Sequence, residues 1–243
     1  MGRAALMVAI GVFVARLVWS GGYGSFVQEK MRIPLALSAL LLLVFGVIEG
    51  VAALRQESRD SDAARRSISP TVGWLLAAPL VVLTAVAPTA LGAAAAQRSE
   101  PLTPTERSTP PRGLPEIDDS EGPADLRVYE FLSRALWDET ASLTGKEIAL
   151  EGIVVNDPDI PDGFRLTRFA VNCCAADGLP LQVAVRGVTG TFDDDEWVRA
   201  VVTWRPPPGG SYLSEGAPKL VEADVISIEI VDDPPSNPYE TPF

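Results

Sequence analysis

Three long runs of apolar residues near the start of the chain constrain its fold more than any other feature. They cover Ala4–Trp19, Ile33–Leu54 and Val72–Ala96, and each is nearly free of charged residues. A helix needs about 20 apolar residues to cross the hydrocarbon core of a bilayer. We therefore predict three membrane helices, at about residues 4–20, 33–54 and 72–96.

The first run is the shortest of the three, and it carries Arg16 near its end. A long arginine side chain can reach the headgroup region from that depth, and Trp19 and Tyr23 are typical interface residues. A cleaved signal peptide is the alternative, although the Trp-Ser-Gly-Gly-Tyr segment that follows is a poor cleavage site. Both interpretations leave the rest of the chain on the same sides of the membrane.

Positive charge next to the second run predicts the orientation. The short segment 55–70 carries Arg55, Arg59, Arg65 and Arg66, and arginines beside membrane helices are retained on the cytoplasmic side. The chain after the third helix then emerges outside. We expect a multi-pass protein of the cell membrane with an extracytoplasmic C-terminal region.

Residues 97–243 differ sharply in charge from residues 1–96. They carry twelve Lys and Arg against twenty-seven Asp and Glu, a net charge of −15, whereas residues 1–96 carry eight against five, a net charge of +3. Such an acidic region argues against nucleic acid as a partner. The chain has no histidine, which excludes Ser-His triads and histidine-ligated metal sites. We therefore do not expect an enzyme.

The acidic region divides into a linker, a folded domain and a tail. Residues 97–124 are rich in Pro, Ser, Thr and acidic residues, which predicts an extended, disordered linker. Asp125 fits a helix N-cap, and apolar spacing predicts an amphipathic helix to about Trp137. Residues 234–243 are too proline-rich for regular structure and form an extended tail, either packed or free.

Five strand-like runs, separated by turn residues, follow the predicted helix. Alternation of apolar and polar residues supports several of them. They cover Lys146–Val155, Phe164–Asn172, Pro180–Arg186, Trp197–Trp204 and Leu220–Val231. Five short strands with one helix predict a small β-barrel of the oligonucleotide/oligosaccharide-binding (OB) type over residues 125–233, and a small open sandwich is the alternative.

Several segments resemble the YcgQ-like family of bacterial membrane proteins, which are commonly encoded beside YcgR-like permeases. The resemblance spans nearly the whole chain, and Asn172-Cys-Cys-Ala-Ala-Asp is its most specific segment. The other segments are Phe26-Val-Gln-Glu-Lys-Met-Arg, Val72-Gly-Trp-Leu-Leu-Ala-Ala-Pro, Ala87-Pro-Thr-Ala-Leu-Gly, Leu143-Thr-Gly-Lys, Leu166-Thr-Arg-Phe and Asn237-Pro-Tyr-Glu. The resemblance implies a YcgR-like permease as partner, with this chain as its accessory subunit.

Cys173, Cys174 and Asp177 form the most distinctive candidate site. Two thiolates and a carboxylate suit Zn(II) or Cu(I), so a metal is one interpretation. A mixed disulfide with a partner or a redox thiol is another. Adjacent residues on a strand point to opposite faces, so we expect one thiol to be buried and the other to be exposed or turned into a loop. In the simplest interpretation both thiols pack in the domain and Asp177 caps the Ala175–Gly178 turn.

Arginines near this strand form a second candidate site. Arg165 and Arg168 flank the predicted strand, and Arg186 and Arg205 lie on others. Converging guanidinium groups can bind an anionic cargo, but in a region this acidic we favour ion pairs with the many acidic residues as the explanation.

Together these features predict a membrane-anchored accessory subunit of a permease complex, with the outer domain as a binding module and no required cofactor. The alternative is a stand-alone metal-binding or redox protein of the cell envelope that uses the cysteine pair.

Overall fold

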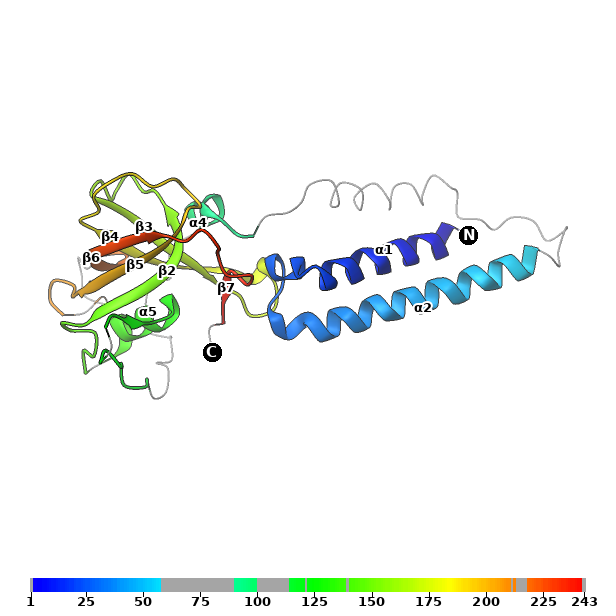
Figure 1. Cartoon of the computed structure of the whole chain (residues 1–243), viewed down its shortest axis with the longest axis horizontal. Helices are drawn as coiled ribbons and strands as arrows, with labels where there is room; N and C mark the ends of the chain where they lie inside the picture. Colours follow the sequence, from blue (N-terminus) through cyan, green and yellow to red (C-terminus); the bar gives the residue numbers. More distant parts are fainter. Residues whose placement is uncertain are drawn as a thin grey trace. The chain divides into compact units, whose positions relative to one another are not determined.

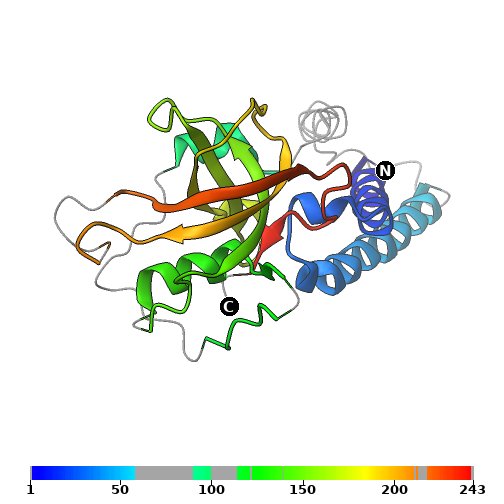
Figure 2. The same ribbon diagram turned by 60° about the vertical axis from the view of Figure 1, so that its left-hand side comes forward.

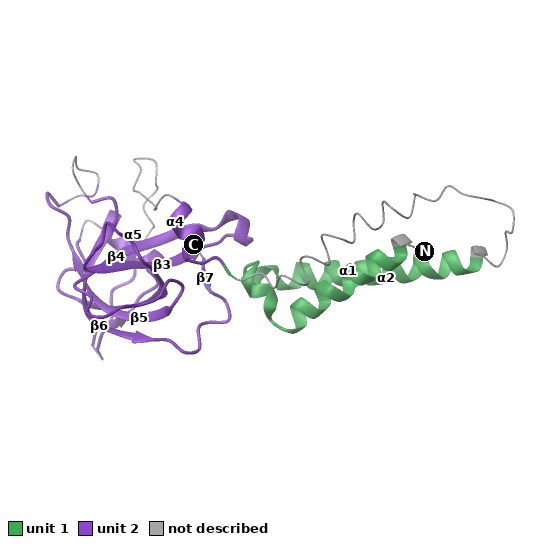
Figure 3. Ribbon diagram, turned by 90° about the horizontal axis from the view of Figure 1, so that it is seen from above, with its two compact units in different colours: residues 1–90 green, residues 91–243 purple. Residues whose placement is uncertain are grey.

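The computed structural model describes residues 2–57, 90–99, 114–120, 122–138, 140–210, 212 and 218–241 (Figure 1). The chain divides into two compact units, Met1–Ala90 and Leu91–Phe243, which Figure 3 colours green and purple.

Two helices that pack against each other make up the described part of the first unit. Helix α1 spans Gly2–Trp19 and α2 spans Arg32–Glu57, with the short 3-10 helices η1 (Gly22–Ser25) and η2 (Glu29–Met31) between them. Glycines let the two helices approach closely. A Cβ atom added at Gly46 would lie 2.7 Å from Val8 Cγ2, and one added at Gly11 would lie 2.9 Å from Leu43 Cγ. Small residues at such contacts are typical of membrane helix pairs.

Much of the surface of α2 is apolar. Large apolar side chains that are about half exposed or more run along its length: Ile33, Leu37, Leu40, Leu41, Val44, Phe45, Val47, Ile48, Val51 and Leu54. By length and composition, Glu29–Arg55 is the one described helix that could cross a membrane, and only 11% of its apolar stretch is buried. The apolar helix Ala4–Trp19 is shorter. One N-terminal helix is therefore a candidate membrane span.

The predicted third membrane helix, residues 72–96, lies mostly outside the described residues. At its end the prediction is wrong, because Ala90–Gly92 are not helical and a separate short helix, α4, spans Ala93–Arg98. Gly92 is extended, and the Ala93 N–H donates to Asp195 Oδ1 at 2.5 Å. Ala93 and Ala96 are buried, and α4 packs against strand β2 (Glu147–Val155) within the second unit.

A seven-stranded sheet forms the second unit, in the order β1-β2-β5-β6-β4-β3-β7, with a further pairing between β2 and β3. The pairs β1–β2, β4–β6 and β3–β7 are parallel, and the other pairs are antiparallel. The strands are β1 (Ala124–Asp125), β2 (Glu147–Val155), β3 (Gly163–Ala170), β4 (Leu179–Arg186), β5 (Trp197–Arg205), β6 (Val221–Ile230) and β7 (Tyr239–Glu240). Each of the five predicted strands is present, with ends within two residues of the prediction.

Helix α5, Val128–Trp137, packs against β2, β3, β4 and β6; in Figure 2 it is the green helix next to these strands. Its apolar residues join the core, where Phe131 is fully buried. Alternate residues of the strands complete this core; on β5 these are Val198, Ala200 and Val202. The alternation that predicted the strands thus reflects one buried face.

The predicted linker, residues 97–124, is packed where it is described. Ile117 is 5% exposed and belongs to the core, and the Pro115 carbonyl accepts a hydrogen bond from Arg134 Nη2 at 2.5 Å. Ala124 and Asp125 pair with β2 as strand β1. The prediction of an unpacked linker is wrong for these residues, because one isoleucine and a backbone carbonyl anchor the segment without any periodic pattern.

Asp125 is not the N-cap of the helix, which begins after Arg127. Glu240 takes that role from the predicted tail: its Oε1 and Oε2 accept the N–H groups of Val128 and Tyr129 at 2.9 and 2.8 Å. A carboxylate at a helix N-terminus satisfies free amides and complements the helix dipole.

Candidate functional site

Cys173 and Cys174 lie in the loop between β3 and β4. The strand ends at Ala170, so neither cysteine is at a strand position, and the short 3-10 helix η3 (Ala175–Asp177) follows them. Cys173 is exposed and Cys174 is half-buried. The expectation of one fully buried thiol is therefore wrong, because the strand alternation on which it rested ends before the cysteines.

Asp177 closes the loop over the cysteines. Its two carboxylate oxygens accept the N–H groups of Asn172 and Cys173 at 3.0 and 2.9 Å, and its own N–H donates to the Cys174 carbonyl at 2.9 Å. The hydrogen bonds from Cys173 lead the effects that lower the pKa of Asp177. The Asp177 carboxylate thus holds the segment before the turn, rather than the turn itself.

The Asp177 carboxylate also affects the pKa of the Cys173 thiol. A side-chain hydrogen bond with Asp177, followed by one with Cys174, raises the pKa of the Cys173 thiol from 9.0 to about 11. A thiol with such a pKa is protonated near neutral pH and is a weak nucleophile, because the thiolate is the reactive form.

The three side chains form a compact set of metal ligands. One ligand atom from each of Cys173, Cys174 and Asp177 lies within 4.8 Å of the others, and the two Sγ atoms are 3.7 Å apart. Two sulfurs bound to one tetrahedral zinc at about 2.3 Å are about 3.8 Å apart. The hydrogen-bonded carboxylate is oriented in the way that outer contacts orient metal ligands.

Arg165 and Arg168 are paired inside the second unit. Arg165 Nε lies 3.0 Å from Asp157 Oδ2, as an ion pair without hydrogen-bond geometry, and Nη1 donates to Gln182 Oε1 at 3.3 Å. The Arg168 guanidinium lies over the Trp197 ring at 4.9 Å and 3.6 Å from Glu240 Oε1. Burial lowers the pKa of Arg168, which nearby carboxylates partly oppose. Their side chains are 14% and 11% exposed.

Arg186 and Arg205 also meet acidic partners. Both contact Glu222, and Arg186 pairs with Asp162 while Arg205 pairs with Asp224. These ion pairs join the ends of β4, β5 and β6.

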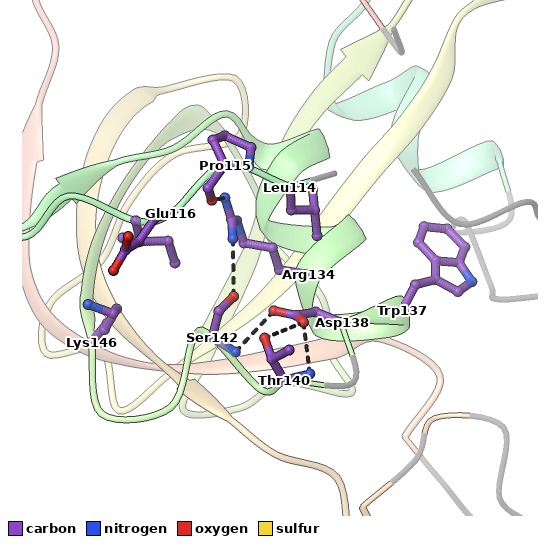
Figure 4. A pocket seen from close by; sticks show the side chains of 10 residues that line it. Leu114, Pro115, Glu116, Arg134, Trp137, Asp138, Thr140, Ser142 and Lys146 are labelled. Carbon is purple, nitrogen blue, oxygen red and sulfur yellow. Dashed lines mark hydrogen bonds between the residues drawn. The ribbon is translucent and has the colours of Figure 1, made fainter. Parts of the chain in front are cut away.

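A pocket of about 510 Å³ lies beside the end of α5 (Figure 4). The Arg134 side chain lines it and donates hydrogen bonds to Ser142 Oγ, the Pro115 carbonyl and Glu130 Oε1. Asp138 Oδ1 and Oδ2 accept hydrogen bonds from Thr140 and Ser142, which outweigh burial and lower its pKa to about 2. The main polar groups of the pocket thus hold the segment 114–117 in place. No pattern in the sequence marked this pocket.

Comparisons with known proteins agree with the second unit as a domain of its own. Residues 126–234 match a family model. That family is described as the DUF1980 C-terminal domain. The match begins just after β1, ends after β6 and covers less than half of the chain, and the description names no activity.

No curated protein matches the chain. A crystal structure of a protein described as an aspartyl-tRNA synthetase from Leishmania major is 13% identical, with a TM-score of 0.26. The alignment covers 48% of this chain and 22% of that one. A similarity this low carries no argument about fold or function.

Proposed function

We propose that this chain is a membrane-anchored accessory subunit of a permease complex, with its second unit as the binding module. The apolar surface of α2 is the observation that carries the proposal. Leu41 and Phe45 lie one helical turn apart and are 56% and 57% exposed. Contiguous apolar surface of this kind marks a membrane or protein interface, and the contact of α2 with α1 is made instead through Gly46.

The proposed arrangement is multi-pass, with the second unit outside the cell. The arginines of residues 55–70 support a cytoplasmic loop after α2. The acidic second unit would then avoid the anionic inner membrane surface. The resemblance to the YcgQ-like family supports a YcgR-like permease as the partner.

The second unit is proposed to be an OB-like barrel. Its strand pairings run β2–β5–β6–β4–β3 and return to β2, and β4–β6 is the parallel pair among these five strands. Barrels of this type are small binding modules with very different ligands. A binding role rather than catalysis also agrees with the absence of histidine from the sequence and with the high pKa of the Cys173 thiol.

An affinity purification tests the accessory role. Tagged full-length protein is recovered from gently solubilised native membranes, and co-purifying proteins are quantified by mass spectrometry. We expect a permease in near-equal amount. A variant with Leu41→Ala and Phe45→Ala should lose most of it, because the exposed face of α2 changes. A matched Cys173→Ser, Cys174→Ser variant should keep it.

Recovery of the chain alone, under conditions that keep other membrane complexes intact, would refute the accessory role. Equal recovery of the permease with the α2 variant would show that the permease contacts another surface of the chain.

A metal centre at Cys173, Cys174 and Asp177 is the second candidate function. The observation that favours it is the convergence of two sulfurs and one carboxylate oxygen within 4.8 Å. Zn(II) or Cu(I) binds the thiolate, so metal binding would release the proton that the hydrogen bond with Asp177 holds on Cys173.

Metal stoichiometry tests this centre. Purified full-length protein is loaded with Zn(II), or with Cu(I) under reducing conditions, and the retained metal is measured after gel filtration. We expect one ion per chain and protection of both thiols from a thiol reagent. Asp177→Asn should weaken retention, and Cys173→Ser should abolish it. No retained ion and unprotected thiols would exclude the centre.

A further inference from the structure

Strand β6 has an open edge along its second half. On one side it pairs with β5 as far as Ile230, but on the other side its pairing with β4 ends at Asp224. Among the described residues, Val225–Ile230 therefore have no strand partner opposite β5. Figure 2 shows β6 as the long red strand beside the orange β5.

The backbone of this edge can bind another strand. The Val231 N–H donates to the Trp197 carbonyl at 2.8 Å. Hydrogen bonding alternates along an antiparallel pair, so Ser227 and Glu229 also direct their backbone groups toward β5. The N–H and C=O groups of Ile228 and Ile230 then point away from β5, toward the open edge.

Two of the apolar side chains along the edge are exposed. Ile226 is the extra residue of a β-bulge opposite Val201 and Val202, and it is 50% exposed. Ile230 is 56% exposed, while Ile228 packs partly on the core. An exposed apolar edge strand is a site where proteins commonly add a further strand.

Negative charges near this edge favour a basic partner. Glu229 on the strand, and Asp232 and Asp233 just after it, make no ion pair with any described residue, whereas Glu222 and Asp224 earlier on β6 are paired with arginines. A second copy of the chain would bring the same carboxylates and the net charge of −15 on residues 97–243. Like charges disfavour that pairing.

We propose that the open edge of β6, Val225–Ile230, binds an extended segment of another protein in which apolar residues alternate with Lys or Arg. The segment adds a strand to the sheet through the backbone groups of Ile228 and Ile230. Its apolar side chains lie beside Ile228 and Ile230, and its basic side chains lie beside Glu229. This contact does not depend on the partner being a permease.

A peptide titration tests the edge on the full-length protein in detergent. The probe is a short fluorescent peptide of alternating valine and lysine, and its binding is followed by anisotropy. We expect saturable binding that weakens with salt. Peptides with glutamate in place of lysine, or with N-methylated backbone amides, should bind at least about tenfold more weakly, because they lose charge attraction or backbone hydrogen bonds.

Protein variants locate the binding site. Ile230→Pro removes an N–H that faces the open edge without removing a bond to β5 and should weaken binding about tenfold. Ile230→Ala keeps that N–H and should weaken binding less. Glu229→Lys should weaken binding and flatten its salt dependence. Unchanged thermal unfolding would show that each variant is folded.

Three results would overturn the proposal. One is the absence of saturable binding by the valine–lysine peptide. Another is equal binding of the N-methylated peptide, which tests the wild-type protein and needs no variant to fold. The third is a dimer of the full-length chain, seen by sedimentation, that Ile230→Pro dissociates, because this would assign the edge to a second copy.

Discussion

Apolar side chains of the same kinds have opposite surroundings in the two units of this chain. Leu41 and Phe45 on α2 are more than half exposed, whereas Leu150 and Phe131 in the second unit are fully buried. The second unit buries its large apolar residues within its sheet and against α5, as a domain in water does. The first unit buries small residues between its helices and turns large ones outward, which is the arrangement expected where the surroundings are apolar.

The comparison extends to charge. Residues 1–96 have a net charge of +3 and residues 97–243 a net charge of −15. In the second unit, buried charges have partners, such as Arg134 with Glu130. The same kind of substitution should therefore have different effects in the two units.

The largest effect is expected from the core of the second unit. Phe131→Ala should lower its free energy of unfolding by about 3–5 kcal/mol, because it leaves a cavity under the sheet. The matched change Leu41→Ala on α2 should alter the stability of the full-length protein in detergent by no more than about 0.5 kcal/mol. Urea denaturation followed by tryptophan fluorescence measures both. Similar losses of stability for the two variants would contradict the expected difference between the two units.

A charge on α2 should act on membrane insertion. Val44→Arg places a guanidinium within the candidate span, at a cost of about 2.5–3.5 kcal/mol near a helix centre. We expect a smaller fraction of the protein to resist carbonate extraction from membranes. Leu179→Arg, at an exposed position of β4, should leave that fraction unchanged. If both variants behave like the wild type, α2 does not need its apolar surface to remain in the membrane.

Glu240 should contribute less than the core but more than an exposed carboxylate. Glu240→Gln removes the charge that faces Arg168 and weakens the bonds to the amides of α5, so we expect a loss of about 1–2 kcal/mol. Glu229→Gln, which breaks no ion pair with a described residue, is the control. Thermal unfolding measures the stability of both variants. Equal stability of the two would mean that water can replace the Glu240 carboxylate at the start of α5.

The smallest effect concerns acid. In the folded chain the pKa of Asp138 is about 2, against an ordinary value of 3.8. A lowered pKa stabilises the fold above about pH 4, and that contribution disappears as the pH falls toward 2. Solvent screening limits it to about 1 kcal/mol or less. The stability difference between wild type and Asp138→Asn should therefore shrink between pH 4 and 2, and a constant difference would contradict this assignment.

Local patterns predicted most of the second unit. The alternation of Val198, Ala200 and Val202 with exposed residues was sufficient to place β5, because a sheet with one buried face imposes a period of two. Cys173 and Asp177 are also close in sequence, so their contact could be anticipated. Whether they hold a metal is a question of chemistry that spacing alone leaves open.

Contacts between distant residues could not be predicted in this way. Glu240 caps α5 across 112 residues, and Ile117 enters the core from a segment that reads as a linker. Neither contact leaves a periodic signal, since each depends on one side chain. The non-helical residues Ala90–Gly92, within the predicted third helix, have the same origin, because Asp195 from a distant loop binds the Ala93 amide.

The position of Glu240 has a consequence for biosynthesis. The helix α5 is made early and its capping carboxylate late, so a ribosome must complete β2 to β7 before the helix acquires its cap. Pairing at such sequence separation slows folding. Until its last strand is made, the nascent second unit would therefore expose apolar core residues, a stage at which chains are prone to aggregate. Chaperones that bind nascent chains would have their main task at this stage.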